Sequence, residues 1–404
     1  MISEAAQQCV KQLLKLTSLN SCLPWEHGGR TRYLTPKKSL TKFYFNVGIF
    51  LVHNFLMLIR FPLTYREIHP LAFLRTIIHL VAILISSFVC IACCAELIFS
   101  KNKIMEYYNS AFSFHDKFAE TYCKSKIKTA GTFNCGYEHW FRAALYFIPL
   151  LAVILFPIYG FMMPHLNIYI SSMFVDYFNR GGFLAQLFLV FLTFLSMWIY
   201  SIGAGMALTI GLLLILPICQ MLVVLKEIRP GFMFSRLTTS MARMPENAIC
   251  TLRCLQVLQK MSNHVTQRNI VPTTTTIQFL LCVCNNYAVL SIPLPNADNI
   301  LPIVYGKMLG IMVSALFTIV FVLVSNITGN VARSYVKTVG VWKNKKLVPC
   351  QKKVLKSLRP DGVKIAFFGS VQRMTALNVV MIIIKYTGRL LISFKGKIPQ
   401  GMSL

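Results

Sequence analysis

The run FLAQLFLVFLTFLSMWIYSIGAGMALTIGLLLILPICQMLVVL, from Phe183 to Leu225, decides how this chain folds. It holds 43 residues and no charged side chain. As a helix it would be roughly 64 Å long, about twice the hydrocarbon core of a bilayer. The run is therefore either one helix that projects far beyond the membrane, or two spans broken near Gly203-Ala-Gly205.

The composition is that of an integral membrane protein. Of 404 residues, 55% are hydrophobic and 13% are charged, which is far more apolar than an ordinary soluble domain. The formal net charge of +28 also occurs in proteins that bind nucleic acids. Here, however, the basic residues stand between long apolar runs and do not form one soluble face. The charge therefore indicates membrane topology, and no nucleic-acid partner is expected.

Seven stretches are long and apolar enough to cross a bilayer, which takes about 20 apolar residues in a helix. They are residues 43–58, 72–99, 141–163, 183–225, 274–294, 308–327 and 374–394. The first is marginal because His53 and Asn54 interrupt it. The sequence thus predicts an all-α integral membrane protein with seven transmembrane helices.

The distribution of Lys and Arg decides between one and two spans in the fourth run. Residues 1–42 hold seven of them, residues 100–139 six, residues 226–273 seven and residues 328–373 eleven, whereas the loops 61–71, 164–182 and 295–307 hold one each. Basic residues are retained in the cytoplasm, and a split fourth run would place the last two basic segments outside. We therefore expect a single fourth helix elongated into the cytoplasm, with the N-terminus cytoplasmic and the C-terminus extracellular. Lys395 and Lys397 are exceptions to this rule, because they would lie in the extracellular C-terminal tail.

The last span, Thr375 to Phe394, carries Lys385 and Arg389 inside an otherwise apolar run. A charge at bilayer depth costs roughly 3 kcal/mol or more, so such residues usually face protein or water. We interpret this segment as the lining of an aqueous path that the other spans hold in place and gate.

The sequence offers little for catalysis, metal binding or a cofactor. Its eight histidines are scattered, and it contains no Gly-x-Ser-x-Gly, Gly-x-x-x-x-Gly-Lys or His-Glu-x-x-His motif. The thirteen cysteines fall in spans or in segments assigned to the cytoplasm, where reduced thiols are expected. Asn285-Asn286 is the one strong polar pair within a span. It either binds a substrate or bonds to neighbouring helices.

This arrangement resembles the insect odorant receptor family, and the likeness includes the elongated fourth span and the long basic stretch before the last one. Locally it is carried by Val363-Lys-Ile-Ala-Phe-Phe-Gly-Ser370, by Met374-Thr375 and by Tyr386 within an apolar run. The related gustatory receptors share the architecture but end in a Thr-Tyr, five apolar residues, Gln-Phe pattern. Here Lys385 replaces the Thr, and Ile392-Ser393 replaces the Gln-Phe. The odorant branch is therefore preferred.

The resemblance implies a ligand-gated cation channel of four subunits, in which tuning receptors assemble with copies of a common co-receptor and the last helix lines the pore. The pore or gate candidates are then Lys385, Tyr386, Arg389 and Ile392. Arg389 stands where the family has an apolar gate residue, and a cation on a cation path raises an electrostatic barrier. Either Arg389 turns away from the axis, or partner subunits supply the conducting wall. We favour the second alternative, which makes the chain a tuning subunit.

The resemblance also implies an odorant cavity in the outer half of the subunit, between spans two, three, four and six. Small, volatile, apolar ligands require aromatic and Met walls with few polar groups. The candidates are His79, Phe156, Tyr159, Phe194, Trp198, Met312 and, in the fifth span, Tyr287. Helix packing or interfacial anchoring is the alternative role for each of them.

These expectations divide the chain into four parts. Residues 1–42 are a cytoplasmic N-terminal segment, and residues 43–327 hold the first six spans, the ligand pocket and cytoplasmic helices in 226–273. Residues 328–373 are a basic cytoplasmic anchor segment, and residues 374–404 are the pore-lining last helix with a short outer tail. The expected function is that of an odorant receptor subunit in the plasma membrane of a sensory-neuron dendrite. It would open a non-selective cation channel together with its co-receptor. The alternatives are a gustatory-type channel, a G-protein-coupled receptor and a transporter.

Overall fold

The structure of the protein is a computed structural model. It describes residues 12, 23–27, 33–66, 91–124, 154–155, 157–158, 161, 170–174, 181–231, 237–266, 279–280, 282–284, 286–287, 289–290, 300–359, 362, 364–365, 369–371 and 375–395.

The charge-free run forms one unbroken helix, α8 (Phe183–Glu227). The prediction of a single long fourth helix is therefore confirmed, and Gly203 and Gly205 do not interrupt it. A Cβ atom at Gly203 would lie 2.7 Å from Cζ of Phe50 in α2 (Thr41–Arg66). Gly203 is thus a point of close approach between two helices.

A second long helix, α11 (Ile300–Lys343), extends well beyond the expected span 308–327 at both ends. It passes residue 328 without a break and carries Arg333 and Lys337 in its second half. The predicted division between residues 43–327 and 328–373 therefore falls inside one helix, where apolar sequence gives way to basic sequence. Among the described residues, two helices are long and apolar enough to cross a membrane, Phe183–Glu227 and Lys307–Lys343. Most of residues 72–99 and 141–163 lie outside the described residues, and the count of seven spans stays a prediction.

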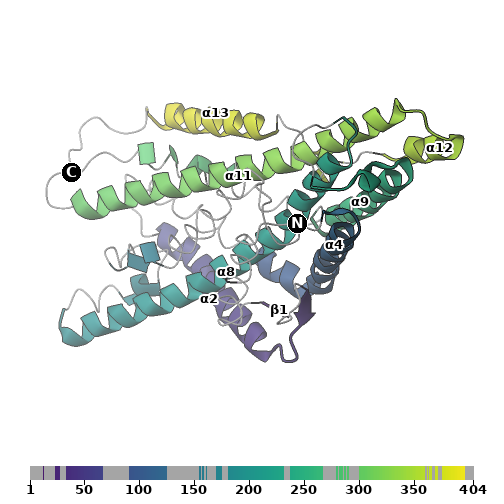
Figure 1. Cartoon of the computed structure of the whole chain (residues 1–404). Coiled ribbons are helices and arrows are strands. Elements are labelled where there is room, and N and C mark those ends of the chain that lie inside the picture. The colour runs from purple at the N-terminus through teal and green to yellow at the C-terminus, as the bar shows by residue number, and fades with distance from the viewer. Residues whose placement is uncertain are drawn as a thin grey trace.

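The helices outside these spans gather at one end of the molecule. They are α4 (Lys101–Tyr122), α9 (Pro245–Thr266) and α12 (Pro349–Ser357). Figure 1 shows them around the C-terminal ends of α8 and α11. Helix α13 (Thr375–Lys395) lies along the part of α11 that is away from α9 and α12. We call this group, with the ends of α8 and α11, the cytoplasmic-side assembly, after the position that the basic residues predict for it.

One buried hydrophobic cluster joins all four basic segments within this assembly. It includes Trp25 from residues 1–42, Tyr108 from residues 100–139, Leu252 from residues 226–273 and Val339 from residues 328–373. These segments are far apart in the sequence, and burial of apolar surface is the main force that brings them together.

Hydrogen bonds from large side chains to backbone carbonyls fasten the same assembly. The indole nitrogen of Trp342 in α11 donates to the carbonyl of Ile228 at the end of α8, at 3.1 Å, and Thr338 donates to Leu225, at 3.2 Å. The Tyr335 hydroxyl donates to Leu252 in α9, at 3.0 Å. Each bond gives a partner to a polar atom that burial would otherwise leave unsatisfied.

Two short hairpins accompany the helices and were not anticipated in the all-α prediction. Strand β1 (Trp25–His27) pairs antiparallel with β2 (Leu34–Pro36), and β3 (Lys364–Ile365) pairs antiparallel with β4 (Gly369–Ser370). The amide side chain of Asn109 in α4 bonds both the backbone N–H and the carbonyl of Leu34, each at 2.9 Å. The first hairpin is therefore attached to α4, and the described fold is mostly helical with two small β additions.

Candidate functional site

The last helix, α13, has two faces of different character. Lys385, Tyr386, Arg389 and Ile392, the four pore candidates, are all exposed, and Ile392 is 79% exposed. Ile383 packs inward and is only 6% exposed. Because residues three and four apart share a helix face, the spacing of Lys385, Arg389 and Ile392 places them on one side, opposite the side that contacts α11. Among the described residues, the structure thus brings Lys385, Arg389 and Ile392 together on one unpartnered face of α13, with Tyr386 beside it.

Aromatic contacts hold the centre of this helix. The guanidinium carbon of Arg389 lies 5.6 Å from the centroid of the Tyr386 ring, a distance suited to a cation–π interaction. The Tyr386 ring in turn meets Phe279 edge to face, with centroids 5.9 Å apart. Tyr386 therefore links the exposed charge to the neighbouring helix.

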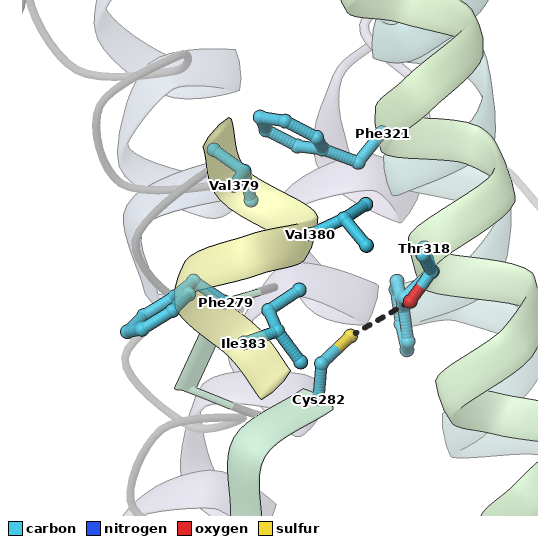
Figure 2. A pocket seen from close by; sticks show the side chains of 8 residues that line it. Phe279, Cys282, Thr318, Phe321, Val379, Val380 and Ile383 are labelled. Atoms are coloured by element: carbon cyan, nitrogen blue, oxygen red, sulfur yellow. Dashed lines mark hydrogen bonds between the residues drawn. The ribbon is translucent and has the colours of Figure 1, made fainter. Parts of the chain in front are cut away.

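A small apolar cleft lies behind α13, on the side facing α11 (Figure 2). Its lining side chains come from α13, from α11 and from the helical segment around 282, and they are Phe279, Cys282, Phe317, Thr318, Phe321, Val379, Val380 and Ile383. The cleft has a volume of about 10 Å³, which is the size of one water molecule at most. It is a packing defect between helices and is too small for an odorant.

The polar groups beside this cleft bond to one another across the helices. The Cys282 sulfur lies 3.7 Å from Oγ1 of Thr318 and 3.8 Å from the carbonyl of Ser314. The Ser314 hydroxyl donates to Oδ1 of Asn286, at 2.6 Å. Of the two roles open to the Asn pair, the bond from Ser314 favours helix packing for Asn286, while Asn285 lies outside the described residues.

The predicted odorant-pocket residues fall in different environments. Phe194 and Trp198 lie on α8 and are 65% and 37% exposed, whereas Tyr287 is buried. Met312 packs beside Leu309 and Val313 in a cluster that includes Leu155 of the third expected span. His79, Phe156 and Tyr159 lie outside the described residues. The Met312 cluster does not include Phe194 or Trp198, so a common pocket for these residues stays a prediction.

Sequence reasoning missed the side chains that pack α13 against its neighbours. Phe317 and Phe321 are four residues apart, as are Val379 and Ile383, so each pair shares a helix face. That spacing was a usable signal for the inward faces. It does not tell which faces meet, because the partner of a helix face lies elsewhere in the chain.

No group of three His, Cys, Asp or Glu side chains that could hold a metal ion occurs among the residues described. His115 of α4 is buried in the cytoplasmic-side assembly, and neither of its ring nitrogens has a hydrogen-bond partner there. Burial lowers the pKa of His115 well below its usual value, because a charged imidazolium is poorly solvated inside a protein.

Comparison with known proteins gives a match to a solved structure and none to a sequence family. No protein-family model and no curated protein sequence matches the chain. Among solved structures, it is similar to the insect olfactory receptor OR5 from Machilis hrabei, with a TM-score of 0.61 and 13% sequence identity. The match covers 95% of this chain and 97% of the receptor.

The fold of this chain is therefore similar to that of an insect olfactory receptor. At 13% identity the likeness shows the fold and leaves the activity open. The fold that the sequence resemblance implied is confirmed over nearly the whole length of the chain.

Proposed function

We propose that the chain is an odorant receptor subunit that binds small, volatile, apolar molecules and opens a non-selective cation channel together with co-receptor subunits in the plasma membrane of sensory-neuron dendrites. The observation that carries this proposal is the structural match to an insect olfactory receptor over 95% of the chain. No catalytic role is proposed, since the described part of the chain offers apolar helices, an exposed cationic face on α13 and packed clusters.

The packing of the four basic segments supports the proposed sidedness. Residues from the segments 1–42, 100–139, 226–273 and 328–373 belong to one hydrophobic cluster, which supports a position of all four on the same side of the membrane. This agrees with retention of Lys and Arg in the cytoplasm. A fourth run split into two spans would have separated these segments.

The exposed face of α13 supports a role for this helix as a wall of the conducting path. Two cations on an otherwise apolar helix need water or a polar partner. The cation–π contact with Tyr386 keeps Arg389 near the middle of the exposed face. This supports the alternative in which partner subunits supply the conducting wall. In a heteromer, co-receptor helices would supply the remaining, less charged part of the wall, as expected for a tuning subunit.

Helix α11 offers a connection between the proposed pocket and the proposed pore. Phe317 packs with the cluster of Leu309 and Val313, next to Met312, and also with the cluster of Cys282 and Ile383 behind α13. An odorant opens the channel only if it binds the open state better than the closed one. A shift of α11 on odorant binding would be transmitted to α13 through the shared contact of Phe317.

The test is whole-cell recording from cells that express the chain with and without an insect co-receptor, under a broad panel of volatile esters, alcohols and terpenoids. Odorant-evoked currents that need both proteins are the expected result. Currents from the chain alone in response to sugars or bitter compounds would assign it to a gustatory-type channel. Saturable uptake of a panel compound without single-channel events would assign it to a transporter, and either outcome would refute the proposal.

A further inference from the structure

Lys385 stands at the middle of α13, where it cannot reach either end of the helix. It is ten residues from Thr375 and ten from Lys395, or about 15 Å from each end. A Lys side chain escapes the hydrocarbon region by extending toward the interface, and this depth is beyond its reach. Lys385 is nevertheless exposed on the unpartnered face. In a membrane, that face must therefore meet water or a polar partner.

Arg389 adds a second charge at nearly the same depth. It is closer to the outer end of α13, six residues from Lys395, so it has the option of extending outward. Instead, its guanidinium lies beside the ring of Tyr386, three residues nearer the middle of the helix. Side chains of helices lean toward the N-terminus, which favours this contact. The two cations are thus held one turn apart on one face.

No acidic side chain from the neighbouring sequence is available to neutralise this pair. Residues 299–360 and 362–404, which include all of α11 and α13, contain no Asp or Glu. Two like charges four residues apart repel each other even on a water-exposed helix. The field of both charges therefore acts on whatever occupies the space beside α13.

We propose that Lys385 and Arg389 form a cationic strip on a water-facing side of α13 and make the path beside it less permeable to divalent than to monovalent cations. The proposal rests on the proposed function for the presence of a conducting path. At about 10 Å in water, two elementary charges disfavour a divalent relative to a monovalent cation by roughly fourfold in permeability. Screening at physiological salt reduces this to about twofold.

The charge of the strip can be measured without opening a channel. Ile392 lies one turn beyond Arg389 on the same face, and no native cysteine follows Cys350 in the chain. Ile392→Cys in the full-length protein, purified in lipid nanodiscs, is treated with an anionic sulfonatoethyl or a cationic trimethylammonioethyl methanethiosulfonate. Modification is followed by mass spectrometry of the C-terminal peptides. Exposed Cys350 is the internal positive control, and Ile383→Cys, on the packed face, is the matched negative control.

The expected result is that Ile392→Cys reacts, with the anionic reagent faster. Adding Lys385→Gln and Arg389→Gln should lower the anionic-to-cationic rate ratio about tenfold at an ionic strength of ~0.01 M. Each substitution alone should give part of the change, which keeps the test valid if the double variant does not fold. No reaction at Ile392→Cys while Cys350 reacts, an unchanged rate ratio, or equal labelling of Ile383→Cys would each overturn the proposal.

Reversal potentials then test the consequence for ion flow. With the co-receptor and the odorant panel, the Lys385→Gln, Arg389→Gln variant should show a Ca²⁺-to-Na⁺ permeability ratio about two- to fourfold above that of the wild type. Absence of wild-type currents would refute the proposed function and leave the labelling result standing. Currents with an unchanged permeability ratio would refute the selectivity role of the strip and leave the channel function intact.

Discussion

The contact between Gly203 of α8 and Phe50 of α2 predicts how these two helices respond to an added methyl group. A Cβ atom at position 203 would stand 2.7 Å and 2.8 Å from two atoms of the Phe50 ring, far inside van der Waals contact. Phe50 is buried in the main cluster and has little room to move. Gly203→Ala should therefore overpack this contact at a cost of about 1–3 kcal/mol.

Gly211→Ala, two turns further along α8, is the matched control. Nothing lies within 4 Å of a Cβ atom built at Gly211, so Ala there should stabilise the helix by about 0.5–1 kcal/mol. The two variants make the same chemical change in the same helix and should differ by about 2 kcal/mol or more in stability. In thermal unfolding of the purified protein, this corresponds to a difference of about 2–4 °C in Tm.

A double-mutant cycle identifies the cause of the difference. In a Phe50→Leu background the ring atoms are gone, and Gly203→Ala should lose most of its penalty, with a coupling energy of about 1 kcal/mol or more. Equal Tm values for Gly203→Ala and Gly211→Ala would refute the close approach of α2 and α8. A penalty at Gly203 that persists without the Phe50 ring would place the clash elsewhere.

Three further predictions concern the cytoplasmic-side assembly and the proposed pocket. Trp342→Phe should lower stability by about 1–3 kcal/mol in denaturant or thermal unfolding, because the carbonyl of Ile228 loses its partner and the smaller ring fills less of the buried site. Val336→Ala at an exposed position of the same helix is the control. The depressed pKa of His115 should make the wild type progressively less stable as pH falls below the ordinary histidine value of about 6.5, because only the unfolded state takes up the proton freely. His115→Phe should remove that pH dependence of Tm, and a wild type equally stable at pH 7.5 and 5.5 would contradict it. Trp198→Ala should change the rank order of responses to an odorant panel, since one methylene in an apolar site is worth roughly 1–3 kcal/mol; identical dose–response curves would remove Trp198 from the pocket.

Among the described residues, buried apolar contacts are distributed unevenly along α11. One end of this helix packs against α8, α9 and α12 in a large buried cluster that also includes the N-terminal hairpin. The other end packs in small clusters around Met312 and behind α13. Local stability follows the density of buried apolar contacts. Among the described residues, the cytoplasmic-side assembly is therefore the more densely packed end of α11.

Much of the fold followed from the amino-acid sequence alone. The charge-free run of residues 183–225 required a helix far longer than a bilayer is thick, and α8 has that length. The four basic segments were placed on one side by their Lys and Arg content, and they pack in one cluster. Spacing along the last helix put Lys385, Arg389 and Ile392 on one face. These are local properties, since residue type and periodicity report which surfaces avoid water and which faces a helix has.

Which faces meet was decided only by the tertiary structure. The sequence offered Gly203 only as a possible break, which the basic residues argued against, whereas in the fold Gly203 lies against the Phe50 ring. Trp342 and Ile228, or Asn109 and Leu34, are bonded although 114 and 75 residues separate them. Phe317 joins two clusters whose members come from four different expected spans. The partner of a side chain depends on how all helices fill the same volume at once, and no short stretch of sequence contains that information.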